Sequence, residues 1–171
     1  VLKLLDGVVD IYLPDFKYWD GKKAATYSSG AETYPEVTRE AILEMHRQVG
    51  VAHHAPDGFM YRGLMIRHLV MPNDVGGTRE ILAWVAASLP KDTYVNVMSQ
   101  YRPTFRAFDF PEIARAITRQ EYDEAVAFAL APVATSCGAD AGATTTTSTT
   151  TSEATSTTAN AAVTAIGAAL G

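Results

Sequence analysis

Three short apolar segments, each followed at once by polar residues, constrain the fold of this chain more than any other feature. Residues 8–13 are rich in β-branched and aromatic side chains and stop at Pro14, which is typical of a buried strand. Residues 64–71 and 93–98 follow the same pattern. The polar residues at the three segment ends are Asp15 and Lys17; Asn73 and Asp74; and Gln100, Tyr101 and Arg102. Parallel strands gather such ends at one edge of a sheet, where ligands usually bind.

Amphipathic segments lie between the three strands. An apolar stripe at helical spacing covers residues 37–49, and Gly50 follows its end. Thr33 and Glu36, just before this stripe, have the spacing of a capping box. A second helix is predicted from Thr78, its expected N-cap, to the stop at Pro90. The resulting β-α-β-α-β order predicts an α/β fold with a parallel sheet and right-handed crossovers.

The remaining segments are assigned from capping and turn residues. Residues 18–31 are predicted to form a polar connection, and residues 51–62 a loop with a turn at Asp57-Gly58. Two more pairs have capping-box spacing and predict two helices after the third strand: Asp109 with Glu112, and Thr118 with Glu121.

Charge and cysteine content exclude several classes of protein. The net charge of −5 gives no basic surface for nucleic acid, and no run of eighteen apolar residues could span a membrane. We therefore expect neither a nucleic-acid nor a membrane partner. Cys137 is the only cysteine, so an intrachain disulfide and a cysteine-rich metal site are excluded. No signal peptide opens the chain, which favours a cytoplasmic protein.

The two ends of the chain differ from its middle. From residue 134 the composition changes to Thr, Ser, Ala and Gly, which predicts a disordered low-complexity tail over 134–171 and leaves one domain over 1–133. The first residues, with Leu2, Leu4 and Leu5 before Gly7, have the pattern of a last helical turn with its C-cap glycine. We therefore expect the chain to be a fragment that begins inside a structural element.

Arg67 interrupts the second apolar strand. A buried arginine costs several kcal/mol unless it is paired or hydrogen-bonded. Two explanations are equally compatible with the sequence: an anionic ligand, or a structural ion pair with Asp10 or Asp15.

Taken together, the strand ends resemble a known enzyme family. The sequences PDFK, IRHLVMPN and YVNVMSQYRP, with the helical segments TREAILEMHRQVG and ITRQEYDEAVAFA, are similar to radical S-adenosylmethionine enzymes. The nearest branch consists of uncharacterised proteins similar to pyruvate formate-lyase activating enzyme. The resemblance covers about residues 1–131 and corresponds to the C-terminal half of the family's partial (β/α)6 TIM-like barrel.

This resemblance implies a reaction, cofactors and partners. In the family a 4Fe–4S cluster reduces S-adenosylmethionine to methionine and a 5′-deoxyadenosyl radical, which takes a hydrogen atom from the substrate. In activases the substrate is a glycine of a glycyl-radical enzyme. Flavodoxin or ferredoxin is the expected electron donor.

The resemblance also implies cofactor-binding positions. Asp15 and Lys17 match the family's Asp-x-Lys, with the lysine near the methionyl carboxylate, and Arg67 matches an arginine that contacts the cofactor. Asn73 stands where the family has a glycine. Gln100 and Tyr101 stand where activases have a histidine.

One departure from the family is large. The cluster motif Cys-x3-Cys-x2-Cys is missing, and Cys137 lies alone in the tail. Because a 4Fe–4S cluster needs cysteine thiolates, this chain alone is expected to be inactive and to contain no catalytic residue.

Two other functions remain open from the sequence. One is a metal-dependent hydrolase or lyase half-barrel, with Asp10, Asp15, His53, His54 and His68 as ligands. The other is a non-catalytic interaction module that uses the edge of the strand at residues 8–13, predicted to be long and apolar, to pair with another chain.

Overall fold

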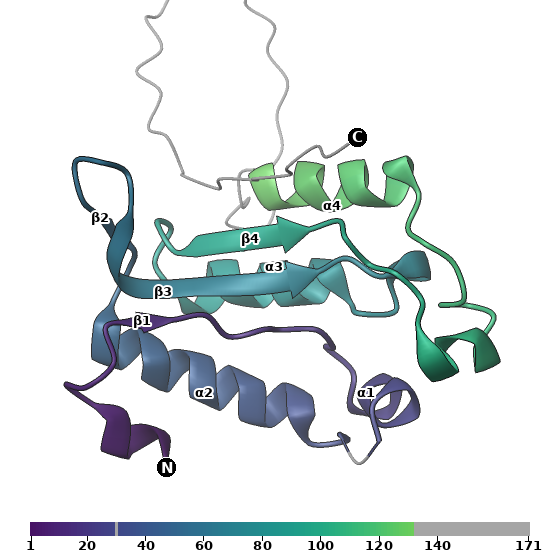
Figure 1. Ribbon diagram of the computed structural model, residues 1–171, viewed down its shortest axis with the longest axis horizontal. Helices are drawn as coiled ribbons and strands as arrows, with labels where there is room; N and C mark the ends of the chain where they lie inside the picture. Colours follow the sequence, from purple (N-terminus) through teal and green to yellow (C-terminus); the bar gives the residue numbers. More distant parts are fainter. Residues whose placement is uncertain (30, 132–171) are drawn as a thin grey trace, which may run out of the picture.

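The computed structural model describes residues 1–29 and 31–131, which form a mixed α/β fold (Figure 1). The tail predicted over 134–171, together with Cys137, lies outside the described residues. The strands are β1 (Ile11–Tyr12), β2 (His53–His54), β3 (Met60–Leu69) and β4 (Tyr94–Met98). The helices are α1 (Gly21–Tyr27), α2 (Tyr34–Val49), α3 (Thr78–Ser88) and α4 (Arg119–Leu130), with 3-10 turns η1 (Leu2–Leu5), η2 (Pro72–Asp74) and η3 (Phe105–Asp109).

The sheet is parallel around β3, as predicted. β1 pairs parallel with the first half of β3, and β4 pairs parallel with the second half, from Met65↔Tyr94 to Leu69↔Met98. The described strands form an open sheet rather than a closed barrel. The predicted loop over 51–62 is wrong in part, because β2 pairs antiparallel with the start of β3 through a tight turn at Gly58.

β1 is much shorter than the predicted strand over residues 8–13. The register set at Tyr12↔Leu64 continues to an isolated bridge between Asp15 and Arg67. The carbonyl of Pro14 accepts from Arg67 N–H at 2.9 Å, so the nitrogen of Pro14 also faces β3. Proline has no N–H to donate, and the ladder is therefore interrupted between the two pairs.

Helices cover one face of the sheet. The side chains of Leu64, Ile66 and His68 on β3 are buried, as are Val95 and Val97 on β4. They belong to one apolar core with residues of α2, α3 and α4. In Figure 1, α3 lies behind the sheet, α2 runs along the β1 side and α4 along the β4 side.

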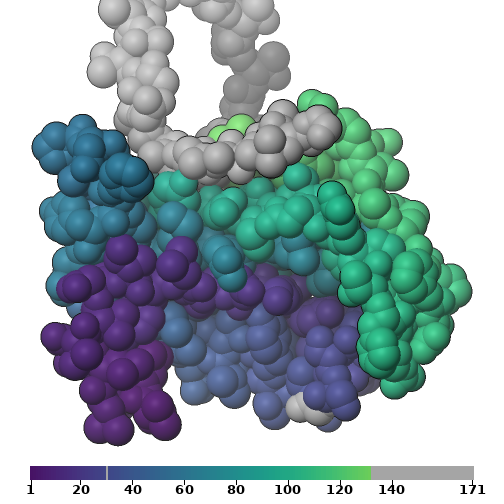
Figure 2. Space-filling view, in the orientation of Figure 1, coloured from purple at the N-terminus to yellow at the C-terminus, as the bar shows by residue number. Residues whose placement is uncertain are grey.

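The alternate residues of β3 and β4 are only half-buried, because no described helix packs on their face of the sheet. This face, called here the open face, includes Met65, Arg67 and Leu69 of β3. It also includes Tyr94, Asn96 and Met98 of β4. Figure 2 shows teal atoms of the β3–β4 region at the front surface, between the purple N-terminal segment and the green end of the described chain.

Several helix boundaries differ from the prediction for identifiable reasons. Residues 18–31 contain α1, a short polar helix without an apolar stripe, whose N-cap Asp20 accepts from Lys23 N–H at 2.8 Å. Thr33 is the N-cap of α2, but its φ and ψ of −85° and 0° are not the extended values of a side-chain cap, and the predicted capping box is absent. None of the described helices is long and apolar enough to cross a membrane.

Of the three other capping predictions, one is confirmed and two are wrong. Thr118 and Glu121 form the predicted capping box of α4. The predicted α-helix starting at Asp109 is absent, because that residue ends η3 and the side chain of Glu112 instead accepts a hydrogen bond from Tyr27 at 2.6 Å. Thr78 is not the N-cap of α3, since Gly77 takes that place with φ +73°.

The start of the chain forms one helical turn, η1, followed by Gly7 with a left-handed φ of +76°. The predicted helix end with a glycine is therefore confirmed, although the turn is a 3-10 helix.

Candidate functional site

Asp15, Lys17 and Arg67 form a cluster of charges on the open face. Asp15 Oδ1 lies 2.7 Å from both Nε and Nη2 of Arg67, and Asp15 Oδ2 lies 3.2 Å from Lys17 Nζ. The side chains are 28%, 41% and 44% exposed for Asp15, Arg67 and Lys17, respectively. One carboxylate is therefore shared by two cations that both remain accessible to a ligand.

The backbone holds this cluster in place. Phe16 N–H donates to the Arg67 carbonyl at 2.8 Å, which fixes Asp15 beside Arg67 in neighbouring strands. From α2, the hydroxyl of Tyr34 donates to the Asp15 carbonyl at 2.7 Å and accepts from Lys17 N–H at 3.0 Å. Burial raises the pKa of Tyr34, so this hydroxyl stays protonated. The strand end and α2 thus determine together where Asp15 and Lys17 point.

These contacts decide between the proposed partners of Arg67. Its ion pair is with Asp15, whereas Asp10 lies 3.8 Å from Arg62. The structural pair is therefore present. The expectation that Arg67 is buried is wrong, because the side chain lies on the open face.

Asn96 extends the cluster and was missed by the sequence reasoning. It is the register partner of Arg67 on β4, so Asp15, Arg67 and Asn96 lie side by side across three strands. Its Oδ1 is buried and has no hydrogen-bond partner among the described residues. Buried polar atoms normally have partners, so this acceptor is a candidate ligand contact. A polar residue in the middle of an apolar strand was the available signal.

Asn73 does not join the Asp15 cluster. Its backbone N–H donates to Glu121 at 2.7 Å, its Nδ2 donates to the Glu112 carbonyl at 2.7 Å, and its Oδ1 accepts from Arg115 at 3.0 Å. These bonds hold Asn73 at φ +56°, the left-handed conformation that glycine would adopt easily. The backbone of Asn73 therefore has a conformation that suits the glycine found at this position in the family. Its side chain, however, is already hydrogen-bonded to Glu112 and Arg115.

Arg115 and Glu121 were also missed by the sequence reasoning. Two nitrogens of Arg115 each lie 2.8 Å from an oxygen of Glu121, and this bidentate pair lowers the pKa of Glu121 well below its usual range. The pair connects α4 to η2 through Asn73. Its role is structural, since every oxygen of the carboxylate is occupied.

Gln100 and Tyr101 also lie outside the Asp15 cluster. Gln100 is exposed, and its amide contacts Met98 Sδ at 3.2 Å. Tyr101 donates to the Ile113 carbonyl at 2.9 Å, and burial raises its pKa. Of the six predicted cofactor-binding residues, the hydrogen bonds and ion pairs of the described region join only Asp15, Lys17 and Arg67.

The five residues considered as metal ligands are not brought together. His68 is fully buried, with Nδ1 donating to the Phe16 carbonyl at 2.7 Å and Nε2 bonded to the Thr78 hydroxyl at 2.9 Å. Both ring nitrogens are therefore used, and burial lowers the pKa of His68. His53 and His54 lie on the exposed β2. Within residues 1–29 and 31–131, no group of three His, Cys, Asp or Glu side chains could hold a metal ion.

The edge proposed for pairing with another chain is shorter than predicted. β1 has two residues, and Pro14 follows it. Short edge strands and edge prolines reduce pairing with other chains. The prediction of a long apolar edge is therefore wrong.

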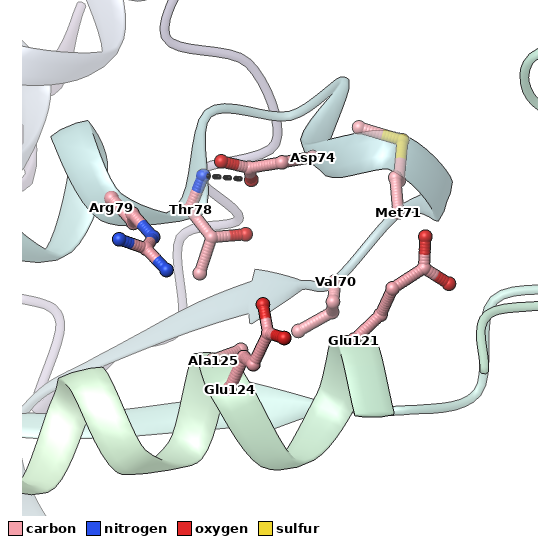
Figure 3. A pocket seen from close by; sticks show the side chains of 8 residues that line it. All are labelled: Val70, Met71, Asp74, Thr78, Arg79, Glu121, Glu124 and Ala125. Atoms are coloured by element: carbon pink, nitrogen blue, oxygen red, sulfur yellow. Dashed lines mark hydrogen bonds between the residues drawn. The ribbon is translucent and has the colours of Figure 1, made fainter. Parts of the chain in front are cut away.

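A small cavity lies on the helix side of the sheet, between the end of β3, the start of α3, and α4 (Figure 3). Its volume of about 60 Å³ suits one or a few water molecules rather than an organic ligand. Asp74 extends into this region and accepts from Thr78 N–H at 2.7 Å, the bond that replaces the predicted Thr78 cap. Glu121 and Glu124 reach it from α4.

Comparison with known proteins gives one relative. Over 129 residues the chain is 33% identical to a protein of Methanocaldococcus jannaschii that is described only as uncharacterized. The match covers 75% of this chain and 33% of the relative, so the chain spans about a third of the length of the curated protein that it matches. No family model matches the sequence. No solved structure matches it either.

Proposed function

We propose that the α/β region is the C-terminal half of a partial (β/α)6 barrel of the radical S-adenosylmethionine type. In this proposal the open face forms part of the pocket for S-adenosylmethionine. The observation that carries the proposal is the Asp15 carboxylate held between Lys17 and Arg67 on the open face.

The distribution of helices supports a barrel origin. In (β/α) barrels the strands are parallel, the helices form an outer layer, and ligands bind at the carboxyl ends of the strands. Here β1, β3 and β4 are parallel, and α2, α3 and α4 pack on one face of the sheet. The open face would then be the inner face of the barrel, and Asp15 and Lys17 follow the end of β1.

The residues of the open face fit the amino-acid end of S-adenosylmethionine. That end carries a carboxylate and an ammonium group, which need a cation and acceptor oxygens. Lys17 supplies an accessible cation, and Oδ1 of Asn96, which accepts no hydrogen bond from the described residues, supplies an acceptor. Asp15 orients Lys17 and Arg67 by pairing with both. When bound in an enzyme of this type, S-adenosylmethionine supplies the 5′-deoxyadenosyl radical.

The described residues do not fit a 4Fe–4S cluster. None of them is a cysteine, and Cys137 lies outside the described region. This chain therefore binds and orients the cofactor in our proposal, while cluster ligands belong to another part of a longer protein. The greater length of the archaeal relative is compatible with such a part. A glycyl-radical enzyme as protein substrate and flavodoxin or ferredoxin as electron donor complete the proposal.

The test uses a longer product of the same gene, with iron and sulfide added without oxygen. We expect an electron paramagnetic resonance signal of a reduced 4Fe–4S cluster and formation of 5′-deoxyadenosine from S-adenosylmethionine. Lys17→Met should raise the concentration of S-adenosylmethionine needed for half-maximal turnover roughly 10- to 100-fold, as expected for a lost charge-assisted hydrogen bond.

Lys23→Met is the matched control, because Lys23 is an exposed residue of α1 outside the Asp15 cluster. It should leave the kinetics unchanged. A longer product that has no cysteine triad, or that forms a cluster but no 5′-deoxyadenosine, would contradict the proposal.

A further inference from the structure

A second, larger cavity lies beyond the carboxyl ends of the parallel strands. Its volume is about 320 Å³, within the usual range for small-molecule sites. It is lined from the segments that follow β1, β3 and β4, including Tyr18, Met71 and Tyr101, and by η3. Crevices at this end of a parallel sheet are common ligand sites.

Aromatic rings form one wall of this cavity. The rings of Tyr18 and Tyr27 are stacked with centroids 6.4 Å apart, and Phe110 packs edge-on against Tyr27 at 5.3 Å. The hydroxyls of Tyr27 and Tyr101 are already bonded to Glu112 and the Ile113 carbonyl. Because these hydroxyls are hydrogen-bonded within the protein, mainly the apolar ring surfaces line the cavity. Such a wall is suited to binding a flat apolar group.

Positive charge forms another part of the lining. The residues that line the cavity include Arg102 and Arg106 but no aspartate or glutamate. Arg106 Nε lies 3.1 Å from Asp109 Oδ2, whereas Arg102 has no ion pair within the described region. Burial and the bond to Glu112 raise the pKa of Tyr27 to about 12, so this hydroxyl remains neutral. Although the chain has a net charge of −5, the guanidinium of Arg102 therefore lines an aromatic cavity without an ion-pair partner in the described region.

Phe105 adds an independent sign of a ligand site. Its backbone has φ +50°, a left-handed conformation that a bulky residue rarely adopts, and its side chain is 88% exposed at the edge of the cavity. Strained residues of this kind are concentrated at binding sites, where the strain holds a side chain ready for its ligand.

We propose that this cavity binds a small molecule with one flat aromatic ring and one carboxylate. The ring lies against Tyr18 and Tyr27, and the carboxylate pairs with Arg102. A planar guanidinium matches a carboxylate in a bidentate geometry. The hydroxyl of Tyr27 is already bonded to Glu112, so its ring surface is free for the apolar group. This site is separate from the Asp15 cluster and does not depend on the proposed cofactor.

The test uses three probes on the full chain, measured by titration calorimetry and ligand-observed nuclear magnetic resonance. Indole-3-acetate has both the ring and the carboxylate, tryptophol has the ring alone, and acetate has the carboxylate alone. We expect indole-3-acetate to bind roughly 10- to 100-fold more tightly than tryptophol, and acetate not to bind measurably. Equal affinity for the acid and the alcohol would overturn the proposal.

Variants then locate the site. Arg102→Gln should reduce the affinity for indole-3-acetate to that for tryptophol, and Arg102→Lys should restore part of the difference. Arg119→Gln is the control, because Arg119 is an exposed arginine of α4 that pairs with Asp123 and does not line the cavity. An unchanged affinity in Arg102→Gln, or an equal loss in Arg119→Gln, would overturn the assignment. Tighter binding of an acidic aromatic peptide than of every small acid would also overturn it.

Discussion

At the scale of single residues, His68 illustrates how a side chain with functional chemistry can be structural. The sequence predicts that His68 lies in a strand beside Arg67 and makes it a candidate metal ligand. In the structure strand alternation turns His68 to the helix-covered face and Arg67 to the open face. His68 then connects the end of β1 to α3 through Phe16 and Thr78. Its burial as a neutral ring has a consequence for stability.

The free energy of unfolding should fall as the pH drops below about 6.5, the ordinary pKa of histidine. Burial lowers the pKa of His68, so below this pH the unfolded chain takes up a proton that the folded protein does not. The resulting loss in the free energy of unfolding approaches about 1.4 kcal/mol for each pH unit between the ordinary pKa of histidine and the lowered pKa of His68. Above the ordinary pKa, His68 causes no such loss.

Urea unfolding at several pH values from about 7.5 to about 5 measures how steeply the free energy of unfolding falls with pH. His68→Gln should be less stable at neutral pH but should lack most of the slope. His53→Gln, on the exposed β2, should retain it. A slope that persists unchanged in His68→Gln would show that another group causes it.

The residue scale also shows what the sequence could predict of the candidate site. Asp15 and Lys17 could be placed at a strand end because alternation and Pro14 define that end. Asn96 could be noticed as a polar residue in an apolar strand, but its position beside Arg67 could not be predicted, because Arg67 lies 29 positions earlier and only the strand register aligns the two. Gln100 and Tyr101 were assigned by resemblance, and the structure does not bond either to the Asp15 cluster.

At the scale of elements, a strong apolar period in the sequence was sufficient to predict a helix or strand. Helix caps and elements of only a few residues could not be predicted reliably. The helix over residues 37–49 and the strand over 93–98 were predicted nearly as observed, because each buries one continuous stripe or alternating face. α1 was missed because its stability comes from the Asp20 cap and from burial of Ala24. β2 was missed because two residues cannot show a period.

Gly63 is the backbone position on which the junction of β1, β2 and β3 depends. Its φ is +123°, and an added Cβ would lie 2.2 Å from the Val51 carbonyl oxygen. Gly63→Ala should therefore lower the free energy of unfolding by roughly 2–5 kcal/mol, from strain and overpacking together. Gly58→Ala is the control, because Gly58 also has a positive φ but open space around it. It should cost about 1 kcal/mol. Equal losses in urea unfolding would contradict this explanation.

At the scale of the whole molecule, the asymmetry of the sheet is the main structural finding. One face is a packed core with α2, α3 and α4, and the other carries Asp15, Arg67 and Asn96 without a described helix over it. The order of β1, α2, β3, α3 and β4 could be predicted from the sequence, because each of these elements has its own apolar period, whereas α1 and β2 were not predicted. Whether the sheet closes into a barrel could not be predicted, because closure depends on strands that pair with the outer edges.

The most direct test of the central proposal is a map of where S-adenosylmethionine contacts the chain. Backbone amide shifts of the nitrogen-15-labelled chain can be followed while S-adenosylmethionine is added to millimolar concentration. We expect the largest changes at the amides of Lys17, Arg67 and Asn96 on the open face, little change at Ile81 and Val85 of α3, and weaker changes in Lys17→Met. An absence of changes, or changes confined to α3 and α4, would contradict the assignment of the open face as a cofactor surface.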